Sequence, residues 1–478
     1  MLFNSIDFAL FLPIVFVLYW SINNKYFKIQ NTLLVVASYF FYGWWDWRFL
    51  FLIFFSTVVD YFVGQKLEKE QSLIKKKRYL WISIFANIGT LFVFKYNNFF
   101  IENLISGFSL FGMQLNASTL NIILPVGISF YTFQTLSYTI DIYKGKLSPT
   151  RDFVAFTAYV SFFPQLVAGP IERASNLLPQ FIKSRKFDEQ NAIRGLKQII
   201  WGLFKKVVIA DSCAPYVNEI FSNYEDYSSL TLLLGIFYFS FQIYCDFSGY
   251  SDIAIGTSRL FGFDLKKNFA FPYFSRDISE FWRRWHISLS TWFRDYLYIP
   301  LGGSRGTIGM KIRNTMLIFV VSGFWHGANW TFIVWGALNA LYFLPLLLKQ
   351  KNRIHTTSIV ASGTILPTIR EAMGMLTTYL LILFSWTFFR ADNIHQALNY
   401  IKKISLLNFS VEKIGLERYN FEVTPFIIAL LLIEWFYRKR EFPFDSGKKS
   451  LVAMVIIIGV IVVFGSYSSI QNFIYFQF

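Results

Sequence analysis

Charged residues are scarce in this chain of 478 residues, where Asp, Glu, Lys and Arg together make up 15% and hydrophobic residues 54%. A water-soluble protein carries roughly 25% charged and about 45–50% apolar residues. The composition therefore excludes an ordinary soluble domain. The 57 phenylalanines and the mean hydropathy of +0.42 agree with this conclusion. We expect lipid to be the solvent for most of the protein surface.

Cysteine is rarer still, with two residues, Cys213 and Cys245, both in apolar stretches. That scarcity excludes a disulfide framework and a cysteine-rich metal site, and we expect no metal centre. The G-x-S-x-G nucleophile elbow is absent, which leaves a hydrolase triad unsupported. Repeats of solenoid period and Pro/Ser-rich linkers are also missing, so we expect a single membrane domain over residues 1–478.

Long hydrophobic runs are what the chain has in abundance. Windows of about 20 apolar residues can cross a hydrocarbon core of about 30 Å as helices, and the alternating pattern of a membrane β-barrel is absent. We expect an all-α polytopic membrane protein with about eleven spans, with some short windows forming re-entrant or interfacial helices. The windows lie near residues 6–22, 31–46, 49–64, 79–97, 120–142, 152–170, 195–212, 229–250, 314–348 (a pair), 371–389, 423–437 and 450–466.

Basic residues outnumber acidic ones by 45 to 29, which gives a formal net charge of +16. In a membrane protein this excess indicates cytoplasmic loops and contact with anionic lipids, so we expect no nucleic-acid partner. Lys and Arg gather at 66–78, 263–313 and 438–449. We predict that these stretches are cytoplasmic and that 263–313 is a basic interfacial region. The N-terminus and the tail 467–478 are then extracytoplasmic.

His326 lies between two apolar runs, in the segment SGFWHGANW over residues 322–330. A helix from the basic boundary at Arg313 to His326 rises about 20 Å, past the centre of the bilayer. Irregular backbone such as the Gly-Ala-Asn turn is tolerated at that depth only beside protein or a water-filled cavity. His326 is therefore a candidate reaction site, and a buried structural histidine is the alternative.

His286 lies in the segment FWRRWHISLSTWFRD over residues 281–295. On one continuous helix it would share an apolar stripe with Trp282 and Phe293, while the arginines share the opposite stripe. This is the pattern of a basic interfacial helix. We expect His286 to face inward and the arginines to bind lipid phosphates.

Carboxylates inside a membrane are costly and indicate functional sites. Asp246 and Asp252 lie close together in an apolar run, and nearby Ser and Gly residues also make each a candidate helix cap. We favour a cap for Asp252 and leave the role of Asp246 open. The segment LGGSRG over 301–306 offers backbone N–H groups and a cation to a phosphate, although it lacks the Lys-Ser/Thr of a P-loop.

Five segments together resemble the membrane-bound O-acyltransferase (MBOAT) family, most closely the bacterial branch that contains the membrane subunit of alginate O-acetyltransferase. Their order and spacing carry the resemblance, which implies a helical shell hollowed from both faces with a central tunnel that narrows at His326. The segments are LPVGISF (124–130), FPQLVAGPI (163–171), the Asp246 segment, RRWH (283–286) and WHG (325–327).

The same resemblance implies a reaction and its residues. His326 would be the central catalytic histidine and His286 the second one. A histidine suits this role because its pKa of about 6.5 lets it take a proton from a hydroxyl near neutral pH and pass it to a departing thiolate. Supporting site residues would be Asp246, Trp325, Asn329 and Trp285.

The partners also follow from the resemblance. The acyl donor would be a cytoplasmic thioester, acetyl-coenzyme A or else an acyl carrier protein, with no bound cofactor. The acceptor would be a cell-envelope polysaccharide, acylated across the bacterial inner membrane with help from an extracytoplasmic SGNH-type partner.

The tail QNFIYFQF over residues 471–478 resembles the C-terminal motif of the small single-span subunit in D-alanylation systems. That resemblance makes Tyr475 a candidate acyl relay. An aromatic anchor at the membrane interface is an equal alternative.

Two other functions stay open from the sequence. One is transfer of D-alanyl or another acyl group to a teichoic acid, peptidoglycan or lipid acceptor. The other is a proton-coupled transporter that uses the His and Asp residues as a relay. Transporters of that kind show paired broken helices in two inverted halves, and the sequence lacks such symmetry.

Overall fold

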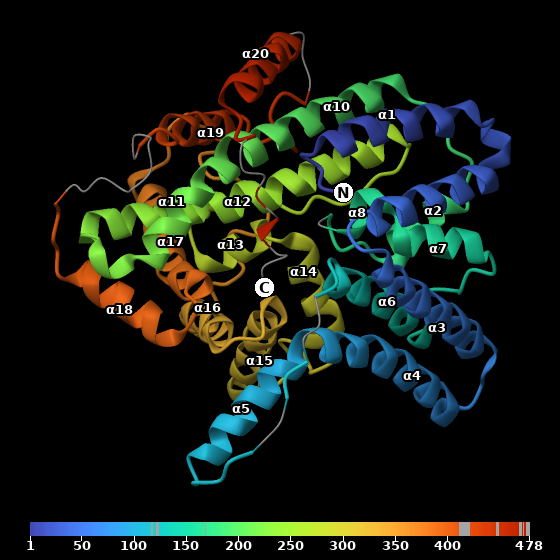
Figure 1. Ribbon diagram of the computed structural model, residues 1–478, viewed down its shortest axis with the longest axis horizontal. Helices are drawn as coiled ribbons and strands as arrows, with labels where there is room; N and C mark the ends of the chain where they lie inside the picture. Colours follow the sequence, from blue (N-terminus) through green and yellow to red (C-terminus); the bar gives the residue numbers. More distant parts are fainter. Residues whose placement is uncertain are drawn as a thin grey trace. The chain divides into compact units, whose positions relative to one another are not determined.

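The computed structural model describes residues 1–115, 118–120, 124–167, 169–410, 421–445, 449–467, 471, 473 and 474. All regular structure within these residues is helical, as predicted (Figure 1). The chain forms two compact units. Unit 1 comprises Met1–Ile193 and Thr257–Lys266, and unit 2 comprises Arg194–Gly256 and Lys267–Phe478. The single domain expected over 1–478 stays a prediction.

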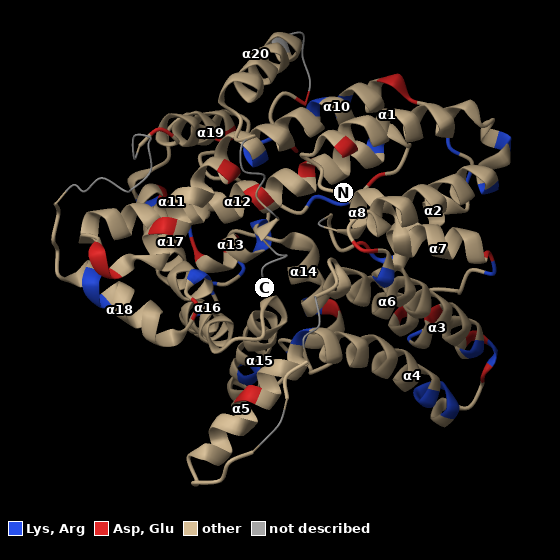
Figure 2. Ribbon diagram, in the orientation of Figure 1, with Lys and Arg blue, Asp and Glu red and all other residues tan. Residues whose placement is uncertain are grey.

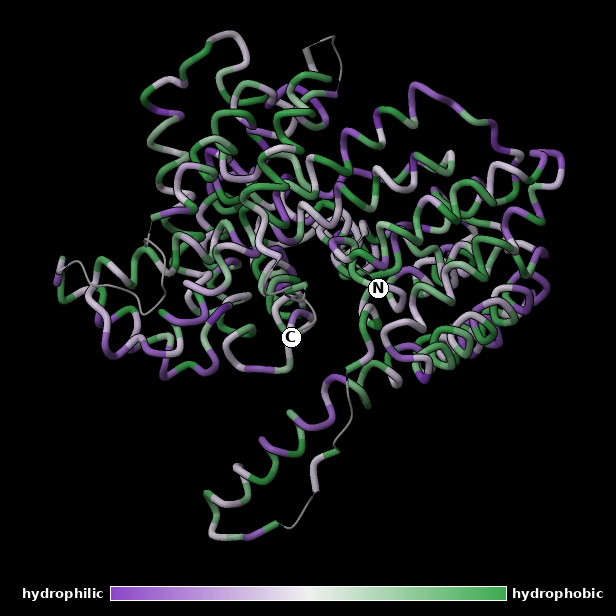
Figure 3. Tube along the Cα trace, turned by 45° about the horizontal axis from the view of Figure 1, so that its top comes forward, coloured by the Kyte–Doolittle hydropathy of each residue, from purple (hydrophilic) through white to green (hydrophobic). Residues whose placement is uncertain are grey.

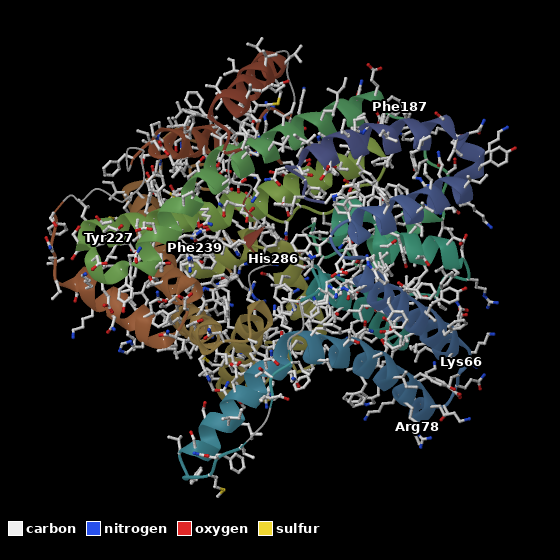
Figure 4. The ribbon with its side chains drawn as sticks, in the orientation of Figure 1. Lys66, Arg78, Phe187, Tyr227, Phe239 and His286 are labelled. Atoms are coloured by element: carbon white, nitrogen blue, oxygen red, sulfur yellow. The ribbon has the colours of Figure 1, made fainter. Side chains whose placement is uncertain are left out.

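Unit 1 is built on the first nine α-helices. Hydrophobic residues run along the helices and hydrophilic residues gather at the turns (Figure 3). Lys and Arg cluster at the turn from α3 to α4 (Figure 2), where Lys66 and Arg78 are labelled in Figure 4. The helices are α1 (Ile6–Ser21), α2 (Phe27–Gly43), α3 (Leu50–Lys69), α4 (Leu73–Leu91), α5 (Asn97–Ser109), α6 (Ile128–Tyr143), α7 (Phe153–Ser161), α8 (Phe163–Leu166) and α9 (Ala174–Phe181).

A buried polar cluster joins α3, α4 and α6 within unit 1. The carboxylate of Asp60 accepts hydrogen bonds from Ser83 Oγ at 2.5 Å and Asn87 Nδ2 at 2.8 Å. Thr135 Oγ1 on α6 donates to Asn87 Oδ1 at 3.1 Å. Apolar burial does not drive helices together in lipid, so hydrogen bonds of this kind help to specify which helices pair.

Unit 2 carries both predicted histidines. The helix α10 (Glu189–Leu203) starts in unit 1 and runs into it. The further helices are the π-helical η4 (Phe204–Ala210), α11 (Asp211–Ser222), α12 (Ser229–Leu260), α13 (Ile278–Arg284), α14 (Ile287–Phe293), the π-helical η7 (Arg294–Tyr298), α15 (Ile308–His326), α16 (Trp330–Leu348), α17 (Ile369–Arg390), α18 (Ile394–Ser405), α19 (Thr424–Phe436) and α20 (Lys449–Phe464).

Five helices among the described residues are long and apolar enough to cross a membrane, and the bent pair Ile6–Ser21 and Asn24–Gly43 can form a sixth span. Shorter apolar helices occupy Phe153–Leu166, Thr424–Phe436 and Ser450–Phe464. The count of about eleven spans stays a prediction. The five helices are Trp47–Lys69, Leu73–Ser109, Ser229–Leu260, Trp330–Leu348 and Ile369–Arg390.

The helices α15 and α16 form a hairpin in which two glycines let the backbones touch (Figure 1). A Cβ atom on Gly323 would lie 2.2 Å from the carbonyl oxygen of Phe332, and one on Gly336 would lie 2.3 Å from that of Phe319. Real Cβ atoms do not approach so closely, so the contact requires glycine on both helices. This close approach sets the position of the turn that follows His326.

Candidate active site

His326 is the last residue of α15, and the turn predicted after it is present. The backbone of Gly327 is extended, and Asn329 caps α16 by accepting a hydrogen bond from the Thr331 backbone N–H at 3.0 Å. Asn329 Nδ2 also donates to the carbonyl of Asp392 at 2.8 Å, which ties the turn to the start of α18. Asn329 therefore supports the site by fixing the hairpin that carries the histidine.

Aromatic rings surround the imidazole of His326, which is 3% exposed. Its ring centroid lies 4.9 Å from Trp325, 5.2 Å from Trp335 and 5.5 Å from Phe389, all with edge-to-face geometry. Trp335 in turn stacks on Trp386 of α17 at 5.7 Å. Such a shell excludes water and strengthens any electrostatic interaction that the imidazole makes.

His286 faces inward as expected, with 1% of its surface exposed, but the continuous helix predicted for 281–295 is wrong. Helix α13 ends at Arg284 and α14 begins at Ile287. His286 between them has left-handed backbone angles, φ 44° and ψ 54°. The N–H groups of Ile287 and Ser288, which a continuous helix would use internally, bond instead to Asn268, at 2.9 and 3.2 Å. This contact spans 20 residues of sequence, so helical periodicity could not reveal it.

The two histidines meet in one place although 40 residues separate them. Their ring centroids lie 6.4 Å apart, and Trp325 lies 6.2 Å from His286. Burial lowers the pKa of His286 to about 3, so its ring is neutral at physiological pH. At this separation both imidazoles can reach one reacting group placed between them. The structure therefore brings together the residue pair that the resemblance implied.

Trp285 packs into the aromatic layer beside the histidines. It is 1% exposed, stacks on Phe281 at 5.5 Å and lies 5.3 Å from Trp386. Phe247 of α12 meets His286 edge to face at 4.6 Å. These rings hold the loop around His286 in position.

Asp246 forms a buried ion pair and Asp252 a partly buried one. The cap predicted for Asp252 is wrong because that residue lies inside α12. Lys205 Nζ lies 2.6 Å from Asp252, and Lys206 Nζ lies 2.8 Å from Asp246 and 2.7 Å from Asp211. Both lysines are on η4, whose wider π-helical turn lets two successive side chains point inward. Two adjacent lysines in the apolar window 195–212 were the sequence signal for this cluster, which we did not predict.

Asp246 also anchors the C-terminal tail. Its Oδ2 accepts a hydrogen bond from the Ile474 backbone N–H at 2.7 Å. Phe473 is fully buried, with its ring 4.6 Å from that of Tyr250 on α12. Asp246 therefore holds Ile474 against α12. Tyr475, the predicted relay, lies outside the described residues.

The two arginines of α13, Arg283 and Arg284, have hydrogen-bond partners within the protein, and their contact with lipid phosphates stays a prediction. Arg284 and Arg276 both bind the carboxylate of Glu280, at 2.7 and 3.0 Å. Burial alone would raise the pKa of Glu280, but the hydrogen bonds from Arg276 and the positive charges of Arg284 and Arg276 together outweigh burial and hold that pKa below its ordinary value. Arg283 donates to the carbonyl of Asn352. Glu280 and Asn352 were not predicted from the sequence as the partners of these arginines.

A cavity opens beside α15, with about 1020 Å³ of empty space including the part open to solvent. At Ser322 its lining comes within one helical turn of His326. Apolar side chains form much of its wall, among them Trp282, Leu289, Phe293, Ile318, Phe319 and Phe343. Its polar lining includes Arg283, Arg294, Arg353 and Ser304. Ser304 belongs to the LGGSRG segment noted for phosphate binding, and Arg353 Nη2 donates to its hydroxyl at 3.3 Å.

Comparison with known proteins identifies relatives over much of the chain. The profile of the MBOAT, membrane-bound O-acyltransferase family, matches residues 146–387. A probable alginate O-acetylase of Azotobacter vinelandii is 41% identical over 402 residues, covering 83% of this chain and 76% of the relative. A peptidoglycan O-acetyltransferase of Helicobacter pylori is 34% identical over an alignment that covers 100% of this chain and 98% of the relative. A teichoic acid D-alanyltransferase of Streptococcus thermophilus is 30% identical over an alignment that covers 55% of this chain and 68% of the relative.

The matched segment contains both histidines, the tryptophans around them and the lining of the cavity, whereas Phe389 lies just beyond it. The long apolar helices accord with a protein that crosses the membrane several times. With the profile covering about half of the sequence and relatives aligned over most of it, the chain belongs to the membrane-bound O-acyltransferase family of multi-pass membrane enzymes.

Proposed function

We propose that this enzyme transfers an acetyl group from acetyl-coenzyme A, on the cytoplasmic side of the bacterial inner membrane, to a hydroxyl on the outer side, for O-acetylation of an envelope polysaccharide. The observation that carries the proposal is the buried pair of His326 and His286, 6.4 Å apart. Relatives named as acetylating enzymes cover more of the chain, at higher identity, than the D-alanyltransferases do. Acetyl is therefore the first choice of acyl group.

The donor would enter through the cavity beside α15. Coenzyme A combines anionic phosphates with a thin thioester arm, which matches a pocket with exposed Arg294 and Arg353 and aromatic walls. Ser322 lines this cavity, and His326 follows one turn further along α15. The basic region 263–313 and Lys349–Arg353 lie on the cytoplasmic side by the positive-inside rule, where this donor is found.

The transfer needs one base and one hydroxyl. An imidazole nitrogen of the histidine pair takes the proton of the acceptor hydroxyl while the hydroxyl oxygen attacks the thioester carbonyl. A carbon–oxygen bond forms, the carbon–sulfur bond breaks, and the thiolate of coenzyme A leaves and receives the proton. Neither oxidant nor metal is required. His326 is our choice of base, with His286 stabilising the reacting group.

We place Tyr475 on the outer side as the first acceptor hydroxyl. Its phenol would become an acetyl ester, which an extracytoplasmic SGNH-type partner then uses to acetylate the polysaccharide. Support comes from the neighbouring tail residues, because Phe473 and Ile474 are buried against α12 rather than extended into lipid. The proposed topology has both termini outside, which requires an even number of spans close to the expected eleven, and a tunnel that narrows at His326.

Replacing His326 by alanine should lower acetylation of the envelope polymer about 10²–10⁴-fold, the usual contribution of a general base. Acetate released by alkali from isolated polymer measures the effect, with protein levels checked on blots of the membranes. His395→Ala is the matched control, since His395 is exposed on α18. Normal acetate content in the His326→Ala strain would refute the catalytic role.

Replacing Arg353 by glutamine should raise the KM for acetyl-coenzyme A about tenfold, because a hydrogen bond to a charged group contributes about 1.5 kcal/mol. Initial rates of thiol release by membranes containing the full chain give KM and kcat, and kcat should change much less than KM. Arg48→Gln is the control, an exposed arginine of unit 1 that pairs with Asp46. An unchanged KM would place the donor elsewhere.

Tyr475→Phe should abolish polymer acetylation while the amount of protein in the membrane stays constant. In cells lacking the SGNH-type partner, mass spectrometry of the C-terminal peptide should show an acetyl group on Tyr475. Tyr467→Phe serves as the control because its hydroxyl bonds to a nearby backbone carbonyl of Ile461. Full acetylation by Tyr475→Phe would favour the aromatic anchor instead.

A further inference from the structure

Asn268 is a fully buried residue of unit 2 that lies in the connection between α12 and α13. Its backbone carbonyl accepts the N–H of Ile287 at 2.9 Å, and two residues later the N–H of Ala270 donates to the carbonyl of Arg284 at 2.9 Å. The segment 268–270 is thus tied to the chain on both sides of His286. These bonds hold the left-handed backbone that aims the imidazole inward.

The side-chain amide of Asn268 has only one orientation that its neighbours allow. Its Oδ1 accepts the backbone N–H of Ser288 at 3.2 Å and the Ser288 hydroxyl at 2.9 Å, and its Nδ2 donates to Ser251 Oγ at 3.1 Å. A backbone N–H can only donate, so turning the amide around would set two donors against each other. The oxygen therefore faces Ser288.

The same oxygen faces His286 Nδ1 at 3.2 Å. Since Asn268 Oδ1 can only accept, Nδ1 has to carry the hydrogen. In a neutral imidazole the lone pair then lies on Nε2, the nitrogen at the far end of the ring.

We infer that Asn268 is a positioning residue for the reaction, which fixes the Nδ1–H tautomer of His286 and so directs the Nε2 lone pair toward the reacting group. The inference rests on the proposed role of His286. The contact is the counterpart of the carboxylate or carbonyl that orients a metal-binding histidine, where loss of the partner typically lowers metal affinity or activity about 10–100-fold, and we expect a loss of the same order here.

The direct test reads the tautomer itself. We would label the full chain in lipid bilayers with ¹⁵N-histidine and assign the His286 signals by their loss in His286→Ala. The inference predicts a protonated Nδ1 and an unprotonated Nε2 in the wild type, and loss of this single state in Asn268→Ala. A wild-type ring with its proton on Nε2 would overturn the inference without any measurement of activity.

Kinetics provide the second readout. Asn268→Ala should lower kcat about 10–100-fold while the KM for acetyl-coenzyme A changes less than about twofold, because the donor cavity is untouched. Asn268→Asp keeps an acceptor oxygen at Nδ1 and should restore most of kcat. Equal losses in both variants, or no loss in Asn268→Ala, would contradict the inference.

Two controls separate the causes of failure. Asn339→Ala removes another buried asparagine, whose amide bonds to the carbonyl of Trp335 in its own helix, and should keep a wild-type kcat and tautomer. His286→Ala tests the proposed function. Full activity in that variant, with the predicted tautomer in the wild type, would reject the catalytic role of His286 and leave the assignment of the proton intact.

Discussion

Polar groups inside this protein have to find their partners within the chain, because neither lipid nor the aromatic core offers any. Three clusters meet that requirement: Asp60 with Ser83 and Asn87, the lysines of η4 with the carboxylates of α12, and Asn268 with His286. Each joins segments that are distant in sequence. Removing one member leaves the others buried without their hydrogen-bond partners, so each cluster constrains the fold. Around the histidines the cluster also constrains the orientation and protonation of the imidazole.

The buried ion pairs link the histidine site to the end of the chain. Lys206 neutralises Asp246, and Asp246 accepts the Ile474 N–H, so the charge that α12 buries also fixes the tail. The ring centroid of Phe247 lies 5.7 Å from that of Phe473 and 4.6 Å from that of His286. Phe473 and Ile474 therefore lie inside unit 2, close to the residues that the proposed transfer uses.

The sequence was sufficient to predict the helical class and the hairpin after His326, because each follows from local pattern. The inward position of His286 is confirmed, although the continuous helix from which it was argued is not present. Apolar runs indicate helices, and glycine beside histidine between two runs indicates a turn. The helix break at His286 could not be predicted from the sequence, because it depends on hydrogen bonds to Asn268, a residue 18 to 20 positions earlier in the chain. The partner of Arg283 was likewise out of range, because Asn352 belongs to the loop after α16, 69 residues away. The Glu280–Arg284 pair, in contrast, is four residues apart on α13, a spacing that the sequence does show.

The central claim is that a buried histidine pair passes an acyl group outward while its carrier stays inside. Right-side-out membrane vesicles, loaded with acetyl-coenzyme A labelled in the acetyl group, test it directly. The account predicts that the label reaches envelope polymer on the outer face, that coenzyme A is retained in the lumen, and that His326→Ala vesicles transfer no label. Label confined to the lumen, or equal transfer by wild-type and His326→Ala vesicles, would contradict it.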